Sequence, residues 1–125
     1  MRQFVFVPLL VLLAAPVPAQ TVPDAMIGRW AGTGVQNGET WTVDLDMRAD
    51  GASVWYPSLP CAARWIFGPS PQPGVVVGLE RVTDRIDLCI DGLDVRVAAR
   101  AKGGLHVEWL DGAGGLVATA DLSAQ

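Results

Sequence analysis

The chain has 125 residues, with 13 acidic against 9 basic side chains and a formal net charge of −4 at pH 7. An acidic chain is repelled by the phosphates of nucleic acids and of anionic membrane surfaces, so we expect neither as a partner. Half of the residues are hydrophobic, and the length is that of one domain with one core.

The N-terminus has the features of a secretory signal peptide. Arg2 precedes an apolar run over residues 4–15, which is too short to span a bilayer, and Val17 and Ala19 occupy the small-residue positions before Gln20. We therefore expect a signal peptide over residues 1–19, a lead-in over residues 20–27 and a single domain over residues 28–125. The mature protein would be periplasmic or secreted, with no membrane insertion after signal removal, because no other long apolar run follows.

Apolar and polar residues alternate through most of the remaining chain, which is the pattern of half-buried strands. The clearest run is residues 40–47, where four apolar side chains share one face: Trp41, Val43, Leu45 and Met47. The expected strands are residues 29–35, 40–47, 52–56, 62–67, 75–82, 86–90, 93–100, 105–109 and 116–122. We expect one helical turn, at residues 23–28.

Turn signals separate these strands at short intervals. Asn37-Gly38 and Asp50-Gly51 tolerate the positive φ of tight hairpin turns. Three prolines in residues 68–74 predict a stiff, exposed connection. The spacing predicts an all-β fold, namely an antiparallel meander of eight or nine strands that forms a closed or nearly closed small barrel.

The two cysteines, Cys61 and Cys89, predict one disulfide, because paired cysteines in a small exported chain are most often bonded. A hairpin sketch places both at the level of Glu80, on the strands that flank it. Such strands are about 10 Å apart in a flat sheet, whereas disulfide Cα atoms lie within about 7 Å. Either Cys61 lies in a loop that folds over the end of the central strand, or the sheet bends sharply there.

Glu80 stands among apolar residues of an expected strand, so its carboxylate could point inward. A buried acid needs a partner, which would be Arg64, expected level with residue 77, or Arg81. The alternative is a surface glutamate near a strand end, beside Arg81 and Asp84.

Five tryptophans are many for a domain of this size. By alternation Trp41 and Trp109 belong to core faces. Trp55 and Tyr56 are neighbours in one strand and must point to opposite sides, so one of them is exposed or lines an opening. Core filling is the simpler interpretation of these aromatics, and a cavity for an apolar or sugar-like ligand is the alternative.

The sequence assembles no catalytic or metal-binding pattern. The single histidine, His106, lies on a polar strand face near Glu108, and no serine stands in a nucleophile-elbow context. No ligand spacing typical of zinc or calcium sites occurs. We therefore expect a protein that is not an enzyme and that uses no metal and no cofactor.

Two resemblances follow from these motifs. Gly28-Arg29-Trp30 resembles the Gly-x-Trp signature of lipocalins and related calycin barrels, in which the tryptophan plugs one end of the barrel and a late arginine, here Arg100, packs across it.

A longer pattern runs from Trp30 to about Leu122 and is similar to a group of small exported bacterial β-domains to which no activity is assigned. The matching motifs are Trp30-x-Gly32, Tyr56-Pro57-Ser58-Leu59-x-Cys61, Glu80 with Val82-Thr83, Cys89-Ile90-Asp91-Gly92 and Trp109. The group usually has glycines directly after the first cysteine, where this chain has Ala62-Ala63. The resemblance implies export and a disulfide between Cys61 and Cys89.

The leading functional hypothesis is a non-catalytic binding module that holds a small ligand in the mouth or interior of the barrel. The residues expected to line this site are Trp30, Trp55, Tyr56, Arg64, Trp65 and Glu80. The alternative is an envelope protein-interaction or inhibitor domain that acts through an exposed rigid loop, either residues 68–74 or residues 56–61. The partner is accordingly an unidentified small ligand or envelope protein.

Overall fold

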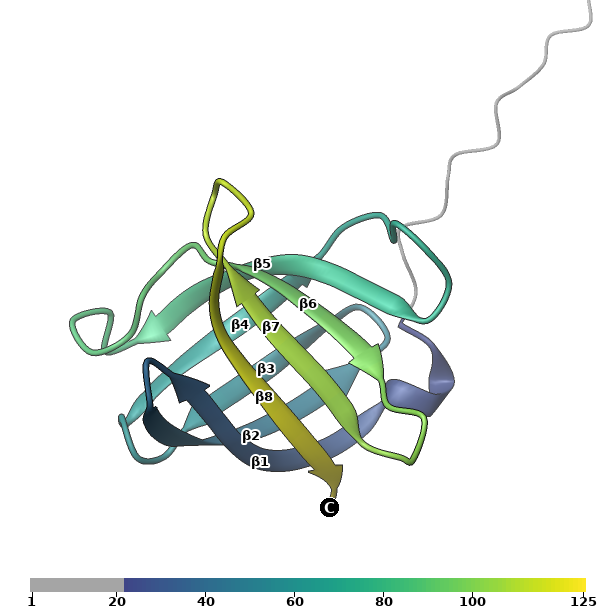
Figure 1. Cartoon of the computed structure of the whole chain (residues 1–125), viewed down its shortest axis with the longest axis horizontal. Coiled ribbons are helices and arrows are strands. Elements are labelled where there is room, and N and C mark those ends of the chain that lie inside the picture. Colours follow the sequence, from purple (N-terminus) through teal and green to yellow (C-terminus); the bar gives the residue numbers. More distant parts are fainter. Residues whose placement is uncertain (1–21) are drawn as a thin grey trace, which may run out of the picture.

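The structure of the protein, a computed structural model, describes residues 22–125 (Figure 1). The predicted signal peptide, residues 1–19, lies outside the described residues. Within the described part no helix is both long enough and apolar enough to cross a membrane.

Eight antiparallel strands follow one another in a meander, which closes into a barrel because the last strand pairs with the first (Figure 1). The strands are β1 (Gly28–Gln36), β2 (Glu39–Arg48), β3 (Gly51–Tyr56), β4 (Cys61–Phe67), β5 (Val75–Asp84), β6 (Asp94–Ala99), β7 (Leu105–Leu110) and β8 (Leu116–Ala124). The prediction of an all-β meander in a closed barrel is confirmed.

The alternation in the sequence becomes the inside and the outside of this barrel. In β2 the inward Val43, Leu45 and Met47 are 0, 2 and 0% exposed, whereas the intervening Asp44 is exposed. Burial of such side chains from every strand forms one apolar core, and removal of apolar surface from water is the main stabilising term of the fold. Most of the interior is therefore filled by side chains.

Close contact between β1 and β2 depends on a glycine. Gly34 lies opposite Trp41, and a Cβ atom at position 34 would lie 2.4 Å from Cε2 of the Trp41 ring. The indole thus occupies the space that a side chain would need. The hairpin that joins the two strands turns at Asn37 and Gly38, both with positive φ (50° and 80°), as the Asn-Gly pair predicts.

The barrel has two different ends. At one end, which we call the base, the lead-in forms a 3-10 helix, η1 (Asp24–Met26), in the place where a helical turn was expected. Val22 and Met26 of this segment are each 1% exposed, and the Trp30 indole Nε1 donates a hydrogen bond to the Met26 carbonyl at 2.9 Å. The lead-in therefore closes the base. The late arginine of the calycin pattern, Arg100, instead forms an ion pair with Asp121, with 3.7 Å between the nearest atoms.

The other end, which we call the mouth, carries the connections over residues 37–38, 57–60, 85–93 and 111–115. The prediction of a ninth strand over residues 86–90 was wrong, because this segment belongs to the β5–β6 loop. The Leu88 N–H donates to the Arg85 carbonyl, so this part of the segment is a turn, and the Val82 N–H on the adjacent edge of β5 donates to the Asp91 side chain instead of to a ninth strand. Arg85 and Gly92, with φ of 60° and 83°, turn the chain at the two ends of the excursion.

The predicted disulfide between Cys61 and Cys89 is present, with 6.4 Å between the Cα atoms. Cys61 opens β4, whereas Cys89 lies in the β5–β6 loop. It is therefore the second cysteine, not the first, that lies in a loop and crosses over the end of β5. The difficulty of spanning two strand spacings arose from the ninth strand, which the barrel lacks.

Candidate ligand site at the barrel mouth

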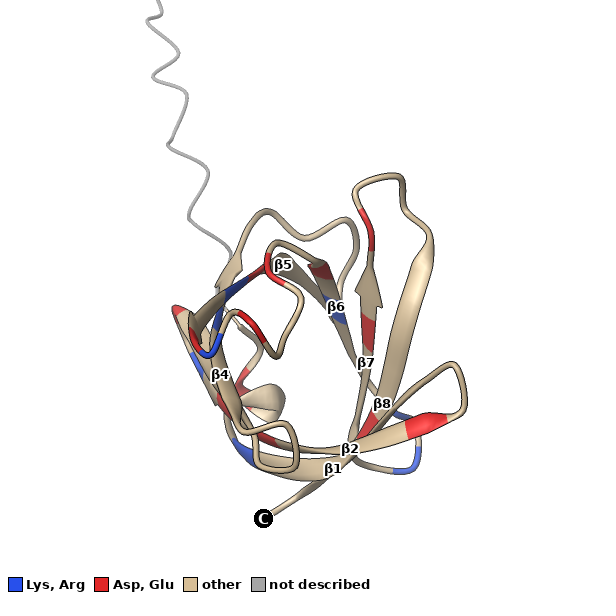
Figure 2. Cartoon of the chain, turned by 90° about the vertical axis from the view of Figure 1, so that its left-hand side faces the viewer, with Lys and Arg blue, Asp and Glu red and all other residues tan. Residues whose placement is uncertain are grey.

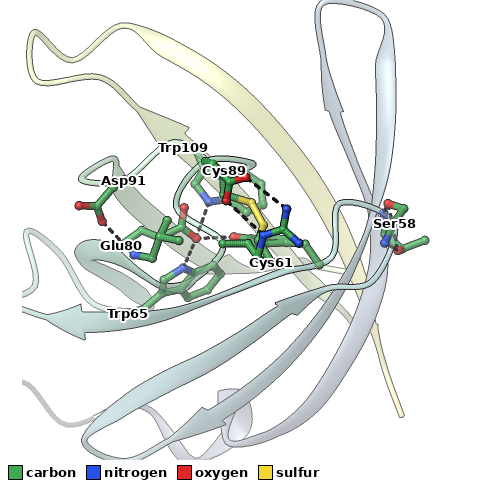
Figure 3. The surroundings of a disulfide bond; sticks show 12 residues. Ser58, Cys61, Trp65, Glu80, Cys89, Asp91 and Trp109 are labelled. Carbon is green, nitrogen blue, oxygen red and sulfur yellow. Dashed lines mark hydrogen bonds and ion pairs between the residues drawn. A yellow bond between two sulfur atoms is a disulfide. The ribbon is translucent and has the colours of Figure 1, made fainter.

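Four strands bring inward side chains together just below the mouth. Alternation turns Tyr56 of β3, Trp65 of β4, Glu80 of β5 and Trp109 of β7 to the interior, where they are 3, 1, 3 and 2% exposed. In the register of β4 and β5, Trp65 lies directly opposite Glu80. One acidic side chain is thus surrounded by three aromatic rings (Figure 3).

The three aromatic side chains all donate to the same oxygen of Glu80. Its Oε1 atom accepts a short hydrogen bond from the Tyr56 hydroxyl, one from the Trp65 indole at 2.9 Å, and a longer one from the Trp109 indole at 3.4 Å (Figure 3). Because every donor converges on Oε1, the second oxygen, Oε2, has no hydrogen-bond partner among residues 22–125. The hydrogen bonds fix the orientation of the carboxyl group and leave one of its acceptors unused.

Burial governs the protonation of this cluster. Loss of hydration raises the pKa of Glu80 above its ordinary value, and the three hydrogen bonds from Tyr56, Trp65 and Trp109 oppose this rise. The pKa of the Tyr56 hydroxyl is raised well above its ordinary value, first by burial and then by the adjacent Glu80 charge. Tyr56 is therefore a proton donor to Glu80 throughout the physiological pH range.

Glu80 and Tyr56 lie at the floor of a pocket of about 290 Å³ that opens at the mouth. This volume is at the lower end of the range typical of small-molecule sites. Most of the lining is apolar or aromatic: Trp41, Tyr56, Leu59, Leu88, Cys89, Ile90, Leu93, Trp109, Val117 and Ala118. The polar lining residues are Gln36, Glu39, Thr40 and Glu80.

The aromatic rings of the pocket pack around Trp109. The Trp41 ring meets it edge to face at 5.9 Å between centroids, and the Tyr56 ring lies tilted at 6.4 Å. Trp65, below them, also packs edge to face against Trp109 at 6.1 Å. Such contacts hold large side chains in one arrangement, so the aromatic wall of the pocket is preformed.

The β5–β6 loop forms one side of the pocket and is held in place at several points. The disulfide joins it to β4 through Cys89. The Asp91 carboxylate accepts a hydrogen bond from the Val82 backbone N–H at 2.8 Å and lies 3.6 Å from the Arg81 guanidinium. At the far end of the loop, the Gly92 N–H donates to the Glu80 carbonyl at 3.0 Å. The loop is therefore a fixed wall rather than a free flap.

Of the six residues predicted to line a ligand site, the structure brings three together. Tyr56 and Glu80 line the mouth pocket, and Trp65 lies beneath them, hydrogen-bonded to Glu80. As expected, Tyr56 and its neighbour Trp55 point to opposite sides of the sheet: Tyr56 is 3% exposed and Trp55 is 40% exposed.

The other three predicted residues lie elsewhere. Trp30, Trp55 and Arg64 line an open hollow of about 710 Å³ beside β1 to β4. The polar side chains of this hollow include both acids and bases, among them Asp44 and Arg29. The six predicted residues are thus divided between two surfaces.

The sequence suggested Arg64 or Arg81 as the partner of a buried Glu80, but neither arginine pairs with it. Arg64 was expected opposite residue 77 but lies opposite Arg81, four residues further along β5. Both arginines sit one residue from the inward-facing pair Trp65 and Glu80, so both point outward. The alternative of a surface glutamate is also wrong, because Glu80 is 3% exposed.

Two residues of the pocket were assigned to core faces and not to a site. Trp41 and Trp109 do point inward, but Trp41 is the third residue of β2 and Trp109 the second-last residue of β7, so both lie next to connections at the mouth. Inward aromatics next to turns at the same end of a barrel line its opening rather than its centre. This signal was present in the sequence, since Asn37-Gly38 was predicted to be a turn and residues 110–115 separate two expected strands.

A scan against protein-family models found no match to the chain, and neither did searches of curated proteins and of solved structures.

Proposed function

We propose that the protein is a binding module that holds a small ligand in the pocket at the barrel mouth. The observation that carries this proposal is the Glu80 carboxyl group, which is buried at the floor of an aromatic pocket with one oxygen free of protein partners among residues 22–125. A concave, mostly apolar pocket with few convergent polar groups is typical of small-molecule sites. The preformed walls reduce the entropy lost on binding.

The same features support placing the protein outside the cytoplasm. The single disulfide fixes one wall of the pocket, and disulfides persist mainly in oxidising compartments. We therefore propose that the ligand is encountered in the periplasm or the extracellular medium.

The proposal is tested with protein purified from its own source and analysed by native mass spectrometry, which reports a bound small molecule as added mass. The site is then located by fluorine NMR of protein labelled with fluorotryptophan. A ligand in the mouth should shift the resonances of Trp41 and Trp109 and leave that of Trp55 unchanged.

Two matched variants separate the pocket from the outer hollow. Trp41→Phe removes an indole from the mouth, and Trp55→Phe makes the same change in the hollow beside β1 to β4. We expect only Trp41→Phe to weaken binding. Absence of any bound mass, together with unchanged tryptophan resonances in a small-molecule extract of the source, would rule out the proposed function. Weakening by Trp55→Phe alone would move the site to the outer hollow.

A protein-binding role is the second candidate, and one observation favours it. The β5–β6 loop exposes three apolar side chains at the mouth, Ile86, Leu88 and Ile90, which are 64, 42 and 53% exposed. Clustered exposed apolar side chains on a fixed loop are typical of contact surfaces. This surface differs from the two loops that the sequence suggested. The loop over residues 68–74 lies at the base of the barrel. In the other loop, residues 56–61, Ser58 is hydrogen-bonded to the backbone and the side chain of Thr42.

A further inference from the structure

The buried carboxyl group at the floor of the pocket has no positive partner within the described chain. Among residues 22–125, no Lys, Arg or His nitrogen lies within 4.0 Å of a Glu80 oxygen. Arg64 and Arg81 point outward, and Arg81 pairs with Asp91 instead. Buried charges in proteins are normally paired or bound to a metal ion, so Glu80 is an exception that calls for a partner.

The charges around the pocket deepen this imbalance. Glu39 on the β1–β2 hairpin also lines the pocket, and no lysine or arginine from residues 22–125 does. Asp91, in the loop behind Glu80, adds negative charge that raises the Glu80 pKa further. Figure 2 faces this end of the barrel and shows acidic segments on several of the connections that surround the opening. Asp91 and Asp87 pair with Arg81 and Arg85, so the negative charge that remains belongs to Glu39 and Glu80 of the lining, and it favours a cation in the pocket.

A metal ion does not fit this site. No group of three or more His, Cys, Asp or Glu side chains that could hold a metal ion occurs among residues 22–125. The pocket above Glu80 is lined instead by the aromatic side chains of Trp41, Tyr56 and Trp109, which pack around one another. Aromatic rings attract organic cations through their negative faces, and a ring of aromatics is the common recognition site for ammonium groups.

We propose that the mouth pocket selects an organic monocation, an amine or quaternary ammonium group with small apolar substituents, with Glu80 as its counter-ion. The inference rests on the proposed binding function and assigns the chemical class of the ligand. The cationic group lies against Oε2 of Glu80 and the aromatic wall, and the apolar substituents contact Leu88 and Ile90 at the rim. The hydrogen bonds from Tyr56, Trp65 and Trp109 hold Oε1, so the carboxyl group needs no reorientation to receive the cation.

The test compares two probes of equal shape and different charge. Choline carries a quaternary ammonium group. Its neutral isostere is the dimethylbutanol isomer in which a tert-butyl group replaces the trimethylammonium group. Titration of the fluorotryptophan-labelled protein at neutral pH should give binding of choline about tenfold tighter or more, since a desolvated cation–π and ion-pair contact exceeds the apolar contact that both probes make.

Variants assign the preference to its cause. Glu80→Gln keeps an oxygen for the donors of Tyr56 and Trp65 while it removes the charge, and it should reduce the preference for choline to about twofold or less. Trp41→Phe should weaken choline binding, whereas Trp55→Phe should not. Choline affinity of the wild type should rise with pH as Glu80 ionises, and dimethylbutanol affinity should not. Of the groups facing Glu80, Tyr56 stays protonated over this range, and Glu39 is exposed at the rim.

The outcomes separate this inference from the function on which it rests. Equal binding of the two probes, or a preference unchanged in Glu80→Gln, would leave a working ligand pocket and overturn the cation assignment. The assignment also fails if source-purified protein carries a neutral or anionic molecule in the mouth. If neither probe binds and no molecule co-purifies, the proposed function itself fails.

Discussion

Glu80 is the residue in which the local structure and the proposed chemistry meet. An ionised carboxylate inside an apolar barrel is costly unless it is hydrogen-bonded or paired, and here hydrogen bonds from Tyr56, Trp65 and Trp109 satisfy only one of its two oxygens. The hydrogen bonds therefore compensate only part of the free energy that the carboxylate loses when it is removed from water. In the proposed function, a cation at Oε2 would offset the remaining cost, so the unpaired oxygen would lower the stability of the free protein and raise its affinity for the cation.

This trade predicts a specific dependence of stability on pH. The pKa of Glu80 is raised in the folded protein relative to its ordinary value of 4.5 in the unfolded chain. Well below pH 4.5 both states hold the proton, and the group contributes no pH dependence to the stability. As the pH rises from 4.5 through the folded pKa, the unfolded chain ionises first, so the free energy of unfolding falls. Relative to Glu80→Gln, the wild type should lose stability as the pH rises over this window.

Urea unfolding of both proteins at a series of pH values measures this difference. Glu108→Gln, the same change on the outward face of β7, controls for the loss of one negative charge. A difference between wild type and Glu80→Gln that is constant from below pH 4.5 to neutral pH would contradict a raised pKa. Choline at saturation should abolish the decline, because the cation favours the ionised form.

At the scale of single residues, the sequence predicted which way a side chain points better than which residue it contacts. Alternation within one strand correctly separated Trp55 from Tyr56, because that property depends only on the period of the strand. The partner of Glu80 depends on the register between β4 and β5, which is set at the proline-rich connection and is unbroken from Phe67 to Ala63. The expected position of Arg64 was therefore displaced by four residues. A shift of the register by an even number of residues leaves each side chain on the same face of the sheet, but it places a different residue opposite it.

Among the elements, the β5–β6 loop has the greatest consequence for the mouth. It leaves the barrel after Asp84 and returns at Asp94. The disulfide connects it to β4, and two backbone hydrogen bonds connect Glu80 of β5 to Gly92 and Leu93. Its alternating apolar residues resemble a strand in sequence. They are instead exposed at the rim, because the chain turns at Arg85 and Leu88 and the disulfide holds Cys89 against β4.

Removal of the disulfide should destabilise both the fold and this loop. The bond closes a loop with a sequence separation of 28 residues. In the chain-entropy model such a closure contributes about 3.6 kcal/mol to stability. We expect the double variant Cys61→Ala/Cys89→Ala to lose about this free energy of unfolding in guanidinium chloride. Hydrogen exchange at the Gly92 amide, which bonds to the Glu80 carbonyl, should become faster.

The amide of Gly68 provides an internal control. It donates to the Val77 carbonyl at the base of the barrel, away from the disulfide. If the exchange rates of Gly68 and Gly92 rise by the same factor, the bond contributes only global stability. In that case the loop is held by its hydrogen bonds and not by the disulfide. A variant with unchanged stability would contradict the entropic argument.

The strands themselves were largely predictable, and the reason is physical. Each has a buried face, so a period of two is enforced over five or more residues, and the turns between them use glycines with positive φ, such as Gly38 and Gly92. Residues 86–90 follow the same period without being a strand. Period alone reports which side chains are apolar; whether a strand forms also depends on contacts far along the chain, here the disulfide to Cys61 and the bond from Val82 to Asp91.

At the scale of the whole molecule, the two ends of the barrel differ, and the proposed binding function belongs to only one of them. The base is closed by η1 and by Trp30, and the centre is filled by buried side chains such as Met47 and Leu122. The mouth retains a pocket above Glu80. The interior was one of the two places considered for a ligand, and its packing leaves the mouth as the place with room. Stability and binding should therefore be separable by mutation.

Met26→Ala tests this separation. The Met26 side chain is 1% exposed beneath the barrel, and its loss should cost about 2–5 kcal/mol of unfolding free energy, as large-to-alanine changes in cores do. The neighbouring Ile27, which is 41% exposed, provides the matched control, and Ile27→Ala should cost less than about 1 kcal/mol. Under conditions where both variants are folded, choline affinity at the mouth should equal that of the wild type, because distant sites act independently.

Equal losses of stability in the two variants would contradict the conclusion that the lead-in closes the base of the barrel. Weaker choline binding in folded Met26→Ala would show instead that the base and the mouth are coupled through the packed centre.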